Sequence, residues 1–127
     1  MRGLAALLLS LAACTSGPTD SQRVAAAMEA LRLVDPVDIE GRREATEKLA
    51  RVDVDDPVAR GARDACVAAY RASTELFGVI AELEEILKSG HAKEREDEAR
   101  ELFRRSGELQ PRAEADLDRC NVELSKL

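Results

Sequence analysis

Small and apolar residues recur along the second half of the chain in alternating steps of three and four. One series runs from Ala59 to Leu87 and another from Ala99 to Leu127. This spacing keeps the side chains on one stripe of an α-helix, as in the contact seam of a coiled coil. The pattern therefore predicts two long helices that pack together. Their seams comprise Ala59, Ala62, Cys66, Ala69, Ser73, Leu76, Ile80, Leu83 and Leu87, and Ala99, Leu102, Ser106, Leu109, Ala113, Leu117, Cys120, Leu124 and Leu127.

The two stripes fit each other in one antiparallel register. Facing residues in an antiparallel pair have numbers with a nearly constant sum, and Cys66 opposite Cys120 defines one such alignment. The same alignment sets Ala62 opposite Leu124 and keeps the stripes together along their whole length. Apolar spacing and cysteine placement thus predict a helical hairpin with a Cys66–Cys120 disulfide far from its turn. The alternative is a pair of buried free thiols.

Local signals predict the ends of the long helices. Asp56 is a favourable N-cap and Pro57 suits the first helical position, so the first long helix is expected from there to about Lys88. The turn that follows should leave His91 solvated rather than acting as a ligand. The second long helix is expected to begin among the acidic residues 94–98, and Pro111 predicts a kink within it.

Two shorter helices are predicted before the hairpin. The first follows a cap at Asp20 or Ser21 and ends near residue 34, and the second begins at Asp35-Pro36 and ends near residue 52. A further stripe lies beside the seam of the first long helix and requires a third helix to cover it. The two short helices, placed end to end, have about the right length. The residues of this stripe are Val67, Tyr70, Thr74, Phe77 and Ala81.

Composition supports an all-α protein. The 127 residues make one small domain, in which aromatic residues are only 2% and no segment alternates as a strand would. We expect residues 20–127 to form an elongated antiparallel helical bundle built on the disulfide-linked hairpin, with a thin, alanine-rich core.

Charge and residue types argue against several functional classes. The net charge of −6 and the few aromatics argue against nucleic-acid binding. A single histidine and the lack of a Cys-x-x-Cys motif predict no zinc or iron–sulfur site, and the acidic loop of Asp53, Asp55 and Asp56 lacks a calcium-binding pattern. No nucleophile lies near a plausible base and no glycine-rich phosphate loop is present, so we predict neither catalytic residues nor a cofactor.

The first fourteen residues form a segment of a different kind. Arg2 is followed by an uncharged run from Leu4 to Ala13 and then by Cys14. Such a run is too short to span a bilayer as a helix but suits the core of a signal peptide. An ordinary secretory leader, or an Ala/Leu-rich helix of a cytosolic protein, is the alternative.

The end of this segment, Leu11-Ala12-Ala13-Cys14, closely resembles the lipobox of bacterial lipoprotein precursors. In that family the leader is removed immediately before the cysteine, which then carries fatty acyl chains such as palmitate. The resemblance implies a signal peptide over residues 1–13, a lipidated Cys14 and a short tether over residues 14–19. Thr15, rather than aspartate, favours the outer membrane facing the periplasm if the cell has two membranes.

Export and acylation would also account for the cysteines. With Cys14 acylated, Cys66 and Cys120 remain as an even pair, and an oxidising compartment allows them to join.

These features predict a lipid-anchored envelope protein that acts as a non-catalytic helical interaction or scaffold module. It would contact the membrane through Cys14 and bind a protein partner that the sequence does not identify. A periplasmic carrier of a small ligand and an inhibitor or immunity-type protein are the alternatives. A carrier requires an apolar pocket of roughly 300 Å³ or more. An interaction module requires an exposed apolar patch, expected near Leu102 and Phe103, and an inhibitor requires a protruding loop, for which the sequence offers only the turn around Gly90.

Overall fold

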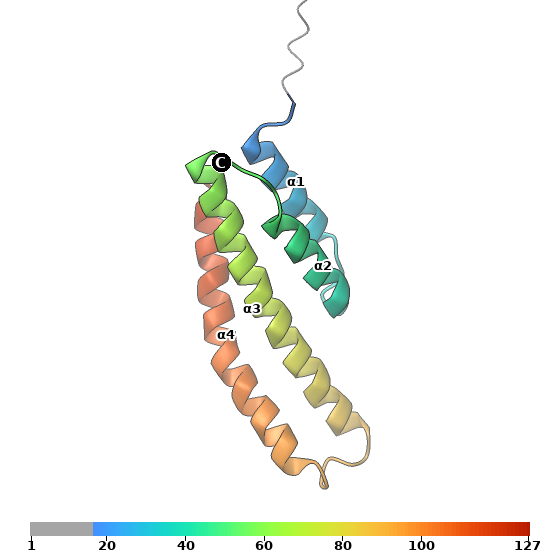
Figure 1. Ribbon diagram of the computed structural model, residues 1–127. Helices are drawn as coiled ribbons and strands as arrows, with labels where there is room; N and C mark the ends of the chain where they lie inside the picture. The colour runs from blue at the N-terminus through green and yellow to red at the C-terminus, as the bar shows by residue number, and fades with distance from the viewer. Residues whose placement is uncertain (1–16) are drawn as a thin grey trace, which may run out of the picture.

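The computed structural model describes residues 17–127, which form four helices and contain no strand. The helices are α1 (Asp20–Arg32), α2 (Ile39–Ala50), α3 (Pro57–Lys88) and α4 (Glu96–Leu124). Successive helices run antiparallel, with α4 on one side of α3 and the shorter α1 and α2 on another (Figure 1). The predicted all-α class and the elongated bundle are confirmed for these residues. The predicted lipobox and Cys14 lie outside them.

The long hairpin of α3 and α4 is the backbone of the fold. α3 begins at Pro57, and the Asp56 carboxylate caps it by accepting a hydrogen bond of 2.8 Å from the Ala59 N–H. Gly90 has a φ of 77°, a left-handed conformation that favours glycine and turns the chain away from the end of α3. His91 is exposed in this turn, as predicted. Both ends of α3 therefore follow from local sequence signals.

A disulfide joins α3 to α4 far from the turn. Cys66 and Cys120 are bonded, their Cα atoms lie 4.5 Å apart, and both side chains are buried. Ala62 and Ala69 are buried one turn to either side of Cys66, and their small side chains let the two backbones approach closely. The predicted disulfide is confirmed, and it clamps the open end of the hairpin.

The contact between α3 and α4 differs from the predicted seam at several positions. Leu87, Leu117 and Leu127 are 62%, 44% and 39% exposed, so the prediction is wrong at these three positions. After Ala69, the next buried apolar residue of α3 is Ala72, three residues on instead of the predicted four, and this shift of one residue is kept through Val79 and Ile86. The apolar positions buried in the half of α3 nearer the turn are Ala72, Val79 and Ile86, each one residue before the predicted Ser73, Ile80 and Leu87.

The first two helices fold back on each other instead of lying end to end (Figure 1). Their connection, around Pro36 and Val37, lines a surface hollow together with Phe77 and Ala81 of α3. The pair therefore stops short of the turn and leaves the last turns of α3 uncovered. The end-to-end prediction is wrong because the connection is long enough for a reversal, which lets α1 pack on both α2 and α3 and buries more apolar surface.

The start of α2 is also later than predicted. Asp35 forms a turn instead of a cap, because its side chain accepts a hydrogen bond from the Val37 N–H and its carbonyl accepts one from the Asp38 N–H. Asp38 then caps α2 through the Gly41 N–H. At α1, Thr19 provides the cap in place of Asp20 or Ser21, and it forms a reciprocal pair of hydrogen bonds with Gln22.

The apolar interior forms two clusters. The larger one joins all four helices near the disulfide, and Val24, Met28, Leu31 and Leu49 are its fully buried large side chains. A smaller cluster near the turn consists of Val79, Ile86 and Leu102, with partly buried neighbours. The turn end of the hairpin is therefore only two helices thick, and part of its apolar surface remains exposed.

Candidate interaction surface

An exposed apolar patch lies beside the turn of the hairpin. We define the tip patch as Leu83, Leu87, Ala92, Ala99 and Phe103, which line a surface hollow of about 390 Å³ together with Glu96 and Arg100. Phe103 is 71% exposed, whereas its neighbour Leu102 is buried in the small cluster beneath the patch. The exposed apolar residue expected near Leu102 and Phe103 is present, but only Phe103 provides it.

The sequence produces this patch through the residues that face away from the helix contact. Burial of Ile86 directs its neighbour Leu87 outward, since adjacent helical residues lie about 100° apart around the axis. Burial of Leu102 does the same for Phe103. Ala92 and Ala99 carry only a methyl group, so the surface between the side chains of Leu87 and Phe103 is recessed. The result is an aromatic side chain that projects beside an apolar hollow.

Charged side chains around the tip patch are largely paired along α4. Glu96 and Arg100 form an ion pair one helical turn apart on the border of the hollow. Beyond it, hydrogen bonds from Arg95 and Arg104 hold the pKa values of Glu98 and Glu101 below the ordinary glutamate value. These carboxylates are therefore ionised and matched by neighbouring guanidinium groups, so the border of the patch has little net charge.

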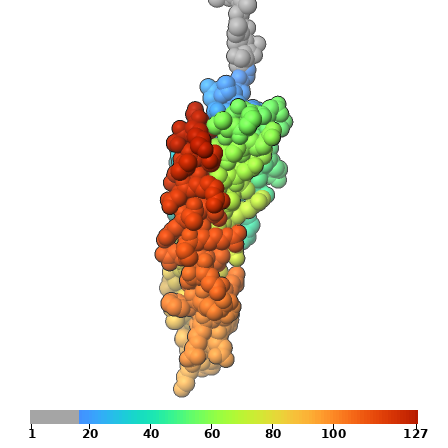
Figure 2. Space-filling model, turned by 90° about the vertical axis from the view of Figure 1, so that its left-hand side faces the viewer, coloured from blue at the N-terminus to red at the C-terminus, as the bar shows by residue number. Residues whose placement is uncertain are grey.

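α4 is widely accessible to a partner. It packs against α3 alone among the described helices and forms one whole side of the molecule (Figure 2). Three of its residues are buried: Leu102, Ala113 and Cys120. Along the rest of α4, most side chains reach solvent.

Other apolar surfaces lie on the α1–α2 pair. Leu33 and Val37 are highly exposed where these helices connect. A groove of about 740 Å³, open to solvent, runs along both helices between Ala26 and Val52, and alanine side chains line much of it. This groove has the volume of a small-molecule site but lacks the enclosing walls that such sites use to bury a ligand.

Arg42 fastens α2 to α3 in the interior. Its side chain is only 7% exposed, and its guanidinium lies 5.4 Å from the ring centre of Tyr70 and 5.1 Å from that of Phe77. It also donates a hydrogen bond of 3.1 Å to the Ser73 hydroxyl. No carboxylate within the described part of the chain forms an ion pair with it, so the two aromatic faces provide its main electrostatic partner.

Sequence reasoning missed this role of Arg42. The stripe that contains Tyr70 and Phe77 predicted a covering helix, but it did not indicate that an arginine of that helix would face the two rings. The spacing of Arg42, Thr46 and Leu49 along one face of α2 was the available signal, and these are the three buried residues of that helix.

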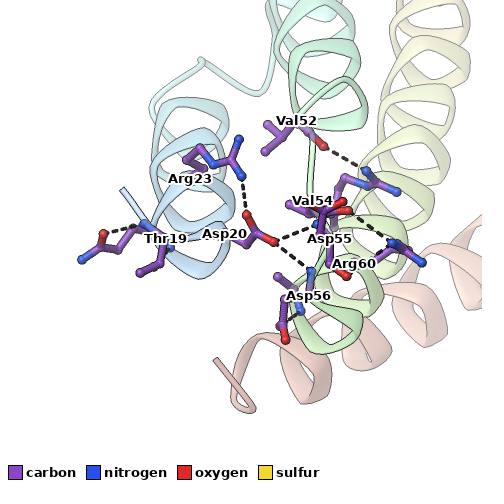
Figure 3. A network of polar contacts seen from close by, with 11 residues as sticks. Thr19, Asp20, Arg23, Val52, Val54, Asp55, Asp56 and Arg60 are labelled. Carbon is purple, nitrogen blue, oxygen red and sulfur yellow. Dashed lines mark hydrogen bonds and ion pairs between the residues drawn. The ribbon is translucent and has the colours of Figure 1, made fainter. Parts of the chain in front are cut away.

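The acidic loop before α3 is organised by Asp20 (Figure 3). The Asp20 carboxylate accepts hydrogen bonds of 2.8 Å from the N–H groups of Asp55 and Asp56 and pairs with Arg23. The pKa of Asp20 lies below its ordinary value of 3.8. The largest cause is the hydrogen bond from the Asp56 N–H, followed by the one from the Asp55 N–H and the one from Arg23. The loop thus connects the start of α1 to the start of α3.

No family model matches this sequence, and no match was found among curated proteins or solved structures. Within residues 17–127, no helix has both the length and the apolar character needed to cross a bilayer. The fold and the surface define the class of protein: a disulfide-linked helical bundle with an exposed apolar patch at one end.

Proposed function

We propose that this chain is a lipid-anchored protein of the cell envelope that acts as a non-catalytic helical interaction module. Its anchor would be acylated Cys14, and its partner-binding surface would be the tip patch. The observation that carries the proposal is the position of this patch, at the far end of the long hairpin from the start of α1 (Figure 1). α3 has 32 residues, so it is about 48 Å long at 1.5 Å per residue. A lipid attached ahead of α1 would hold one end near the membrane and present the patch away from it.

The composition of the tip patch supports a role in binding. Leu87 and Phe103 are large apolar side chains that lie mostly in water, beside a hollow in which a partner side chain could be buried. Such contiguous exposed patches are typical of interaction sites, and aromatic residues are frequent among those that contribute most binding energy. Both residues lie on long helices that pack against each other through Val79, Ile86 and Leu102 beneath the patch. The surface is therefore preorganised, which lowers the entropic cost of binding.

The α1–α2 groove favours a second candidate function, a carrier of a small ligand. Its volume of about 740 Å³ falls within the usual range for ligand sites. However, the groove is open to solvent, and the alanine side chains in its lining are too short to enclose a ligand. An interaction module accounts better for the exposed Phe103 and Leu87, which a carrier does not require.

A photo-crosslinking experiment tests the binding role of the tip patch. A photoreactive amino acid would replace Leu87 in the full chain, produced in a bacterium with two membranes, and Ala115 would be replaced as the control. Ala115 is exposed on α4 outside the patch. We expect a discrete adduct from position 87 that disappears when Phe103→Ser is added. Equal labelling from positions 87 and 115 would remove the support for a binding surface at the tip.

The lipid anchor needs its own test. Cells would be labelled with radioactive or alkyne-bearing palmitate, and the chain would be compared with its Cys14→Ala variant. We expect the label and membrane fractionation to be lost in the variant. An unmodified Cys14 in a soluble chain would contradict the anchor without affecting the tip-patch result.

A further inference from the structure

We propose that a groove along α3 binds a basic amphipathic helix of a partner protein. We define the α3 groove as two adjoining hollows on the flank of α3 that the α1–α2 pair leaves uncovered. It shares no lining residue with the tip patch. Its occupancy requires neither that patch nor the lipid anchor.

The shape of the α3 groove suits a helix. Its first hollow, of about 300 Å³, lies between the α1–α2 connection and α3, and the second continues it toward the turn. Together they follow α3 from Phe77 to Ser89, which is about 18 Å at 1.5 Å per residue. A partner helix of about 12 residues has this length. Laid here, it would extend toward the turn the layer that α1 and α2 form over α3 (Figure 1).

The lining of the first hollow indicates one face of the partner. Val37 is 82% exposed, Ala81 is exposed, and Phe77 and Ile80 are half-buried, so apolar surface here remains in contact with water. A helix with apolar side chains three and four residues apart could cover it, as in other helix-in-groove contacts. The apolar lining consists of Pro36, Val37, Ile39, Phe77, Ile80 and Ala81.

Charge indicates the other face of the partner. Residues 72–87 carry four glutamates and no basic residue, whereas arginines accompany the glutamates of α4. Glu84 lines both hollows and Glu85 lines the second. Lys88 lies 3.9 Å from Glu84, a long contact for an ion pair, and no ion pair within residues 17–127 involves Glu85. Lysines or arginines beside the apolar stripe of a partner helix would therefore find complementary carboxylates.

Titration with a synthetic peptide tests the α3 groove. The probe is a helical peptide of about 14 residues with leucines on one face and lysines on the other. Its counterpart carries glutamate in place of every lysine. Each peptide would be added to the ¹⁵N-labelled full chain with Cys14→Ser at about 0.15 M salt, where exposed charges more than about 8 Å apart are largely screened. Amide chemical shifts locate the peptide, and their dependence on its concentration gives the dissociation constant.

Matched variants separate the α3 groove from general attraction to an acidic protein. Glu84→Lys/Glu85→Lys reverses two charges in the groove. Glu114→Lys/Asp118→Lys, at exposed positions on α4, changes the net charge equally outside it. Ala81→Arg, also at an exposed position, fills the groove with a long cationic side chain. The amide spectra of the free variants show whether the fold is intact.

We expect the lysine peptide to shift amides of residues 36–39 and 77–89. Its dissociation constant should rise about tenfold with Glu84→Lys/Glu85→Lys and with Ala81→Arg, and less than about threefold with the α4 control. Equal effects of the two double substitutions, or equal binding of the two peptides, would overturn the proposal. So would the lack of localised shifts at about 1 mM peptide, a concentration at which weak contacts are measurable. Shifts confined to the tip patch and abolished by Phe103→Ser would also overturn it, while supporting the proposed function.

Discussion

Loss of the Cys66–Cys120 bond should lower the stability of the whole bundle. The two cysteines are 54 positions apart in the sequence, so the bond restricts about half of the described chain in the unfolded state. The chain-entropy model assigns about 4 kcal/mol at 25 °C to a loop of this length. Small domains have total unfolding free energies of about 5–15 kcal/mol, so the bond supplies a large share. For a domain of this size, 1 kcal/mol corresponds to about 4 °C, which predicts a fall of about 16 °C in Tm.

Urea denaturation followed by circular dichroism at 222 nm measures this effect. The comparison uses oxidised protein, reduced protein and Cys66→Ala/Cys120→Ala, all in a Cys14→Ser background that removes the remaining thiol. Reduction isolates the crosslink because both sulfurs remain in place. The double variant also loses their packing, since both side chains are buried, and should be roughly 1–2 kcal/mol less stable than the reduced protein.

The control is the double variant with and without reductant, which should give identical unfolding curves. The reasoning is refuted if oxidised and reduced proteins differ by less than about 1 kcal/mol in their free energies of unfolding. That result would mean that the unfolded chain already holds residues 66 and 120 close together, or that strain in the folded state offsets the entropic gain.

Three further perturbations test the interior and the loop before α3. Leu49→Ala should lower the free energy of unfolding by about 2–5 kcal/mol, because Leu49 is fully buried in the main cluster; a loss below about 1 kcal/mol in urea denaturation would contradict this. Arg42→Met should change the free energy of unfolding by less than about 1.5 kcal/mol, because methionine keeps the packing between Tyr70 and Phe77 and removes the buried charge. Arg42→Ala loses that packing and should cost about 2–4 kcal/mol. Equal losses of stability in thermal melts of the two variants would refute this explanation. Asp20 has a lowered pKa in the folded state, so it stabilises the fold above about pH 4 and loses that effect as the pH falls through its folded value. Asp20→Asn should therefore be less stable than the natural chain at pH 7, with the gap in urea midpoint narrowing toward pH 3; a gap independent of pH would show that the carboxylate charge is not responsible.

Local patterns account for the long hairpin. The ends of α3 depend on Asp56 and on Gly90, whose effects act within a few residues and can be recognised without knowledge of the rest of the fold. The register near the open end follows from Ala62, Cys66 and Cys120, because the disulfide requires close backbones and the small side chains permit them. An exposed apolar surface around Phe103 was also predictable, because Leu102 and Phe103 are adjacent and a helix that packs on one side cannot bury both side chains.

Long-range packing decided the remaining features. Asp35 and Asp38 are both acceptable helix caps, and the reversal of the chain between α1 and α2 selected Asp38. A periodic stripe identifies the residues that seek burial, but the path of α4 around α3 determines that Ile86 is covered and Leu87 is not. Arg42 can lie in the interior only because Tyr70 and Phe77 face it from another helix. Burial and charge compensation depend on neighbours distant along the chain, and the folded arrangement of the helices supplies those neighbours.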